Sequence, residues 1–188
     1  AHSIALTVEQ AFYIPGYGMQ TAAATLAGNM IGARDQKKLY EVTRLLLVII
    51  LVIMTVSGAT LFLLAPQLLA LFTKDSRVIA LGAGVLRMVA VSEPLFGVLV
   101  ILEGIFNGVG DTVRPFYYAL FSMWGVRIFF TFLCVHLFHL GLYAVWASMI
   151  ANNVCLATLF ILRYRRGKWN PLNQQKSAGE KEQGKEYV

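Results

Sequence analysis

Long uncharged stretches alternate with short polar clusters along most of this chain. The first stretch covers 24 residues from Gln10 to Ala33, and the second covers 29 residues from Leu45 to Thr73. A helix rises about 1.5 Å per residue, so either stretch could cross a hydrocarbon layer of about 30 Å. We therefore expect helices that span a membrane.

Three further apolar segments follow. The sequence Asn-Gly-Val-Gly-Asp-Thr at 107–112 separates the third helix from the fourth, and a short connection at 139–141 separates the fourth from the fifth. The pattern predicts an all-α integral membrane protein with about five transmembrane helices within residues 1–168. We expect helices at 3–32, 42–72, 76–107, 113–138 and 141–166. Residues 169–188 are polar and are predicted to form a disordered cytoplasmic tail.

Composition agrees with a membrane protein. The chain is 57% hydrophobic and 14% charged, with a mean hydropathy of +0.64, whereas soluble domains carry about 25% charged residues. Its net charge of +6 does not indicate nucleic-acid binding, because the basic residues lie in short clusters between apolar runs. Basic residues concentrate on the cytoplasmic side of membranes. We therefore expect three of these clusters and the C-terminus on the cytoplasmic side of an inner (plasma) membrane. These basic residues are Arg34, Lys37, Lys38, Arg44, Arg114, Arg163, Arg165, Arg166 and Lys168.

No pattern of an enzyme is present. The chain has no HExxH, CxxC, nucleophile elbow or P-loop, and its three histidines lack the spacing of a metal site. The Gly-Val-Gly segment at 108–110 follows a membrane helix and lacks a βαβ context, so it is not a dinucleotide loop. Cys134 and Cys155 lie in apolar runs and are expected to be buried rather than paired. Because the chain starts at Ala1 without a signal-peptide pattern, we interpret it as a fragment whose N-terminal part is missing.

Ionisable residues at membrane depth are the main functional signal. A charge inside the hydrocarbon region costs several kcal/mol, so it normally faces a protein interior or a water-filled path. Glu103 lies roughly 12 Å from Asp111 along its helix, and Arg127 lies roughly 18 Å from Pro115 along the next. The two side chains therefore share a depth. We interpret them as a proton or cation relay, with a static ion pair as the alternative.

Other polar positions are weaker candidates. Glu93 lies roughly 27 Å from Asp111, which predicts a solvated carboxylate near the outer interface. Pro94 frees a backbone carbonyl that could coordinate a cation in a broken helix. Glu9 and Gln10 lie near the outer end of the first helix and could face a cavity or the interface.

The fourth helix carries candidates for a substrate cavity. Tyr117, Met123 and Trp124 could form an adaptable apolar wall for flat organic cations, although lipid-facing packing would use the same residues. On the first helix, Gly28 and Gly32 have the GxxxG spacing that lets helix backbones approach closely.

Several segments have the order and spacing of one transporter family. They are AHSIA at 1–5, Pro15–Gly16, ATLAGNMIGARD at 24–35, GIFNGVGDTVRP at 104–115, WGVRI at 124–128, GLYAVW at 141–146 and RYRRGKW at 163–169. Together they cover positions across most of the first 169 residues. The chain thus resembles the MATE (multidrug and toxic compound extrusion) transporters.

This resemblance implies twelve spans in two six-helix lobes, with the chain forming most of the C-terminal lobe beside a missing N-terminal lobe. It implies a secondary-active antiporter that exports drugs, organic cations or other amphipathic small molecules by alternating access. Sodium or protons would be the coupling ion, with no other cofactor. Many members carry an acid in span ten at the position of Phe96, where this chain instead has acids at Glu93 and Glu103.

Two other functions stay open. A lipid-linked saccharide flippase of the same superfamily would share the fold, but its anionic substrates would be expected to need several cavity arginines, and only Arg127 lies deep here. A membrane subunit without transport activity would not need the buried charges of Glu103 and Arg127.

Overall fold

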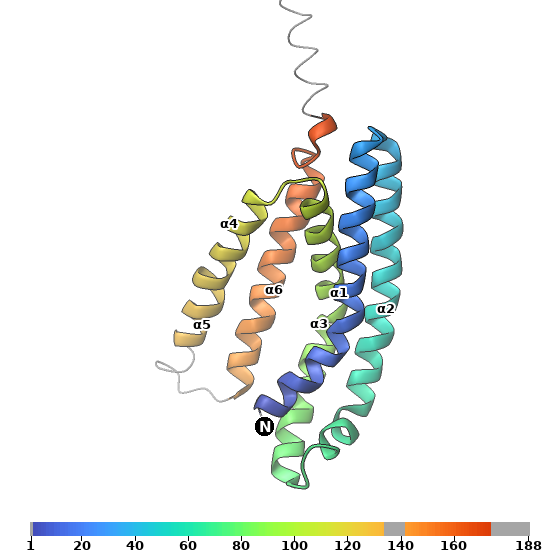
Figure 1. The fold of residues 1–188 in the computed structure, drawn as a ribbon. Coiled ribbons are helices and arrows are strands. Elements are labelled where there is room, and N and C mark those ends of the chain that lie inside the picture. The colour runs from blue at the N-terminus through green and yellow to red at the C-terminus, as the bar shows by residue number, and fades with distance from the viewer. Residues whose placement is uncertain (1, 134–141, 174–188) are drawn as a thin grey trace, which may run out of the picture.

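The computed structural model describes residues 2–133 and 142–173, which form helices and turns with no strand among them. Figure 1 shows the long helices side by side in a bundle, with α1, α2 and α3 running in alternating directions. The elements are α1 (His2–Gly32), α2 (Gln36–Ala70), α3 (Ser76–Gly108), α4 (Val113–Phe121), the π-helix η1 (Ser122–Ile128), α5 (Phe129–Phe132) and α6 (Leu142–Arg165).

Three of these helices are long and apolar enough to cross a membrane: α2, α3 and the Tyr143–Arg165 part of α6. The outer face of α2 exposes a row of apolar side chains, with Leu45, Val52 and Val56 each at least 58% exposed. In water such a continuous apolar face would promote aggregation, whereas in a bilayer it contacts the lipid chains. The chain is an all-α membrane protein.

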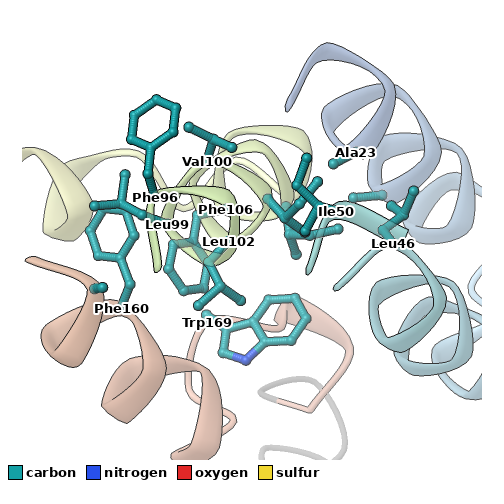
Figure 2. Close-up of a cluster of buried hydrophobic side chains, with 14 of the residues drawn as sticks. Ala23, Leu46, Ile50, Phe96, Leu99, Val100, Leu102, Phe106, Phe160 and Trp169 are labelled. Atoms are coloured by element: carbon teal, nitrogen blue, oxygen red, sulfur yellow. The ribbon is translucent and has the colours of Figure 1, made fainter. Parts of the chain in front are cut away.

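Helix α3 is the centre of the bundle and contacts α1, α2 and α6. It has no separate polar face, as expected of a helix that packs against several others. Its two halves belong to two clusters of buried side chains. Figure 2 shows one of them, in which Phe106 lies between Phe160 of α6 and Trp169, with ring centroids 5.4 and 5.9 Å away.

Small residues let α1 and α3 cross closely, and the tightest contacts lie at glycines of α3 rather than at the pair of α1 glycines that the sequence pattern favoured. A Cβ atom on Gly104 would lie 2.4 Å from the Gln20 carbonyl oxygen, and one on Gly108 would lie 2.2 Å from that of Ala24. On α1, a Cβ on Gly28 would lie 3.4 Å from the Gly108 carbonyl oxygen, so Gly28 lies at the same crossing, whereas Gly32 has open space around it. The close approach therefore depends on Gly104 and Gly108 of α3 packed against the backbone of α1.

The C-terminal part of the bundle extends past the predicted boundary at residue 168. Trp169 is 1% exposed, and its indole Nε1 donates a hydrogen bond to the Tyr164 carbonyl at 2.9 Å. Asn173 donates to the Tyr40 hydroxyl of α2. Residues 169–173 thus pack on the bundle instead of starting a disordered tail. The predicted tail from 174 on, the connection at 139–141 and Cys134 lie outside the described residues.

The second helix also differs from its predicted range of 42–72. It starts at Gln36, because the Asp35 carboxylate accepts a hydrogen bond from the Lys38 backbone and caps the helix.

Candidate functional site

A cavity of about 250 Å³ lies between α1, α3, η1 and α6. Its walls combine polar and aromatic side chains, a composition found at ligand sites. The polar side chains are those of Glu9, Gln10, Ser92, Arg127 and Asn153, and the aromatic ones are those of Tyr13, Tyr17, Phe96 and Trp146. The structure therefore brings Gln10 and Arg127, two of the predicted site residues, to one cavity.

Helix α1 contributes an acid and a phenol to this cavity. Glu9 and Tyr13 are four residues apart and so share a face of the helix. The Tyr13 hydroxyl donates a hydrogen bond of 2.6 Å to the Glu9 carboxylate, which is 6% exposed. The Tyr13 ring stacks on Phe96 with centroids 3.9 Å apart and an interplanar angle of 21°. Packing against α3 thus fixes the phenol that holds the carboxylate.

Arg127 enters the cavity from the π-helix η1. Single π turns are rare and are frequent at functional sites, because the extra residue redirects the side chains that follow. The Ser122 hydroxyl, at the start of η1, donates to the Asn152 side chain of α6 at 2.8 Å and anchors the segment. Arg127 then lies near enough to Glu9 for their charges to attract each other.

Glu93 is buried, which contradicts the prediction of a solvated carboxylate at the outer interface. Its side chain is 0% exposed, and among the described residues neither carboxylate oxygen has a hydrogen-bond partner. The prediction measured depth from one end of the helix only. Helix α3 has 33 residues, so it is roughly 50 Å long and Glu93 lies near its middle.

The surroundings of Glu93 contain a freed backbone carbonyl. Pro94 has no N–H, so the carbonyl of Ala90 lacks its usual helical partner. A Cβ atom on Gly58 of α2 would lie 2.6 Å from that carbonyl oxygen and 3.1 Å from the Cβ of Glu93. The carbonyl and the Glu93 side chain therefore meet α2 at the same point. Glu93 also lies close enough to Glu9 for their charges to interact.

Glu103 and Arg127 are not brought together. Glu103 lies on the side of α3 that faces α1, where its carboxylate interacts with the side chain of Gln20. Among the described residues, Glu103 and Arg127 form no ion pair. Glu103 meets Gln20, whereas Arg127 lines the cavity around Glu9, and these two partners are roughly 16 Å apart along α1, so the structure does not place Glu103 and Arg127 at one depth.

The predicted substrate residues of α4 and η1 lie elsewhere. Tyr117 and Trp124 line an open apolar depression together with Leu120 and Phe121, and they are 61% and 63% exposed. Met123 is 50% exposed and is not part of that depression. None of the three lines the cavity around Glu9. Their exposure fits the alternative interpretation of packing against lipid.

The cavity also contains Glu9, which the sequence placed at a cavity or at the interface, and residues that the sequence pattern did not select. Asn153 is a polar residue within an apolar helix, and that contrast was the signal available for it. Phe96 and Tyr13 carry no such signal, because aromatic residues are ordinary in membrane helices. Phe96 occupies the position where the resemblance implies an acid, and it lies in the cavity beside Glu9.

Comparisons with known proteins give one consistent result. The family model described as MatE matches residues 1–133. A protein of Thermotoga maritima named "Probable multidrug resistance protein NorM" is 27% identical over 168 residues, which cover 89% of this chain and 36% of that protein. A Bacillus subtilis protein named "Uncharacterized transporter YisQ" is 28% identical over 155 residues, covering 82% of this chain and 34% of that protein.

A solved structure shows the same fold. It is described as the inward-facing conformation of a multidrug resistance MATE family transporter of the MOP superfamily. The superposition has a TM-score of 0.79 at 24% identity and covers 90% of this chain and 39% of that one. The chain thus spans a little over a third of the length of the proteins that it matches.

Proposed function

The chain belongs to the MatE family, and on that premise we propose that it forms one lobe of a cation-coupled antiporter that exports organic cations or related amphipathic compounds. Relatives named as multidrug resistance proteins support this substrate class. The observation that carries the proposal is the buried, unpartnered carboxylate of Glu93 beside the cavity of Glu9 and Arg127.

Glu93 is the proposed carrier of the coupling ion. An ionised carboxylate with no hydrogen bond costs several kcal/mol in an apolar interior, so it needs a proton or a metal cation as its partner. A sodium ion would find the carbonyl of Ala90 as a second oxygen ligand, as in transporters whose interrupted helices coordinate sodium with freed carbonyls. A proton would need only the carboxylate. Either ion would be held between α2 and α3 and close to the charge of Glu9.

Glu9 is the proposed contact for a cationic substrate. Its charge is offset by the Tyr13 hydroxyl and by Arg127, so an approaching organic cation would compete with Arg127 for the carboxylate. The rings of Tyr17, Phe96 and Trp146 offer cation–π and stacking contacts in the same cavity. Because Glu9 and Glu93 interact, binding of a cation at one changes the charge felt at the other.

The cavity of this chain holds only part of a substrate. Its volume of about 250 Å³ is below the 300–1,000 Å³ that drug-sized ligands commonly occupy. We propose that a second lobe of the same protein supplies the opposite wall. Alternating access would then consist of the two lobes rocking about the shared site.

The proposed orientation follows from the ends of the bundle. The end of α6 and the starts of α2 and α4 lie at one end in Figure 1, and they carry the basic clusters around Lys37, Arg114 and Arg166. Basic clusters favour the cytoplasm. We therefore assign that end and the C-terminus to the cytoplasmic side of the plasma membrane. The function that we propose is transport and not enzymatic catalysis.

Ethidium accumulation tests the proposed function in cells that make the full-length protein. The proton and sodium gradients are collapsed one at a time. We expect less ethidium in these cells than in cells without the transporter, and a return to the control level when the coupling gradient is lost. Accumulation equal to the control under every condition would contradict drug export and favour the flippase.

A further inference from the structure

A second pocket lies at the proposed cytoplasmic end of the bundle, where α4 begins and α6 ends (Figure 1). It measures about 200 Å³. Four of its lining side chains are basic: Arg114 at the start of α4, and Arg163, Arg166 and Lys168 at and after the end of α6. None of the lining residues is acidic. The pocket is thus a concentration of positive charge outside the cavity proposed for transport.

One of the four charges is fixed in place by a neighbouring acid. Arg163 is 6% exposed, and its Nε and terminal nitrogen lie 2.6 and 2.5 Å from the same oxygen of Asp111. Asp111 is itself held by the turn after α3, where its backbone N–H donates to the Phe106 carbonyl at 2.9 Å. This pair offsets a single positive charge. Arg114 and Arg166 are exposed around it, and they leave the pocket positively charged.

The rest of the pocket is apolar. Tyr118 of α4 and Leu159 and Leu162 of α6 line the side that leads along the bundle, and Leu162 is 46% exposed. A dissolved anion gains nothing from such a wall. A phospholipid uses both parts, because its phosphate meets the basic residues while its acyl chains follow the apolar helices. Basic pockets between membrane helices on the cytoplasmic side bind anionic headgroups in this way.

We propose that this pocket binds the headgroup of an anionic phospholipid, with its chains in the groove between α4 and α6. Arg114 contacts the phosphate from the start of α4, and Arg166 contacts it from the turn just after α6. The bound lipid would join the start of α4 to the end of α6 at the level where Asp111 and Arg163 already join them. The assignment is independent of the transported compound and of the coupling ion.

Lipid retention by the full-length protein, purified in detergent, tests the proposal. Native mass spectrometry titrates the wild type with dioleoyl phosphatidylglycerol and with dioleoyl phosphatidylcholine. The test variant is Arg114→Gln/Arg166→Gln. The matched control is Lys37→Gln/Lys38→Gln, which removes two exposed basic residues at the same end of the bundle but outside the pocket.

We expect the wild type and the control to prefer phosphatidylglycerol, and the test variant to bind it about 30-fold more weakly. This factor corresponds to about 1 kcal/mol for each basic residue removed near the lipid. Because Arg114 and Arg166 are exposed, the variant should remain folded, which its elution as a single species checks. Equal retention by variant and control would overturn the proposal. Displacement of the lipid by inorganic phosphate at similar concentration would overturn it in favour of a soluble anion.

Discussion

The crossing of α1 and α3 depends on Gly104, and replacing it with alanine gives a prediction of defined size. The added Cβ would lie 2.4 Å from the Gln20 carbonyl oxygen and 3.0 Å from the Cβ of Ala23. Ordinary contact begins near 3.4 Å, so the helices must separate by about 1 Å at this point. The main obstacle is a backbone atom, which no side-chain rotation can move. Overpacking of this kind costs about 1–3 kcal/mol.

The control for Gly104→Ala is Gly18→Ala on α1. Both glycines lie inside helices, but a Cβ on Gly18 meets nothing within 4 Å. Alanine improves helix propensity by about 1 kcal/mol at either position, so this gain cancels when the two variants are compared. We therefore expect Gly104→Ala to be about 1–3 kcal/mol less stable than Gly18→Ala.

Denaturant unfolding of the purified full-length protein, in one detergent, measures this difference. Gly108→Ala should also lower the free energy of unfolding relative to Gly18→Ala, because its Cβ would lie 2.2 Å from the Ala24 carbonyl oxygen. If Gly104→Ala were as stable as Gly18→Ala, the close crossing of α1 and α3 would be refuted, and with it the placement of Glu9 beside α3.

Three further variants test other parts of the structure. Asp111→Asn leaves Arg163 buried without its counter-charge, so the free energy of unfolding should fall by about 3–5 kcal/mol, and an unchanged thermal midpoint would contradict this. Trp169→Ala empties a side-chain volume that is 1% exposed and should cost about 3–5 kcal/mol, whereas a tail free of the bundle would show no loss. Tyr13→Phe keeps the ring on Phe96 but removes the donor to Glu9, so drug transport should weaken while the thermal midpoint stays within a few degrees; normal transport would exclude the phenol from the site.

The helical architecture could be predicted because the length of an uncharged segment must match the thickness of the hydrocarbon layer that its helix crosses. Uncharged stretches such as 45–73 have one plausible structure in lipid, and the family resemblance supplied the order of the helices. The packing of residues 169–173 on the bundle was not predictable from composition. Polar residues around Trp169 suggested a tail, and only the tertiary contact with Tyr40, Tyr164 and Phe106 keeps the indole in the bundle.

The candidate site was harder to predict, because a sequence gives neither how far one helix is shifted along another nor the direction in which a side chain points. Counting from the helix ends predicted similar depths for Glu103 and Arg127, but one faces Gln20 and the other faces Glu9, eleven residues apart on α1. The GxxxG pattern had the same weakness. Glycines with this spacing occur in both α1 and α3, and which pair forms the crossing depends on how the helices rotate about their axes.

The depth of Glu93 could have been corrected from the sequence alone. A helix of 33 residues exceeds the thickness of the hydrocarbon region, so it must extend beyond it at one or both ends. Measured from both ends, Glu93 lies in the middle of the helix. It is next to Pro94, which interrupts the backbone hydrogen bonds of the helix. The combination of a central acid and a central proline is the signal that favours a buried ion site.

The most direct test of the coupling site is gradient-driven ethidium transport in liposomes that contain the full-length protein, with Glu93→Gln compared with Glu103→Gln. Both variants replace a carboxylate of α3 by an amide of equal size. We predict that the transport rate driven by the coupling gradient is at least about tenfold lower in Glu93→Gln than in the wild type. Glu103→Gln should keep most of the wild-type rate. Transport by Glu93→Gln at the rate of the wild type would contradict the assignment of the coupling ion to Glu93.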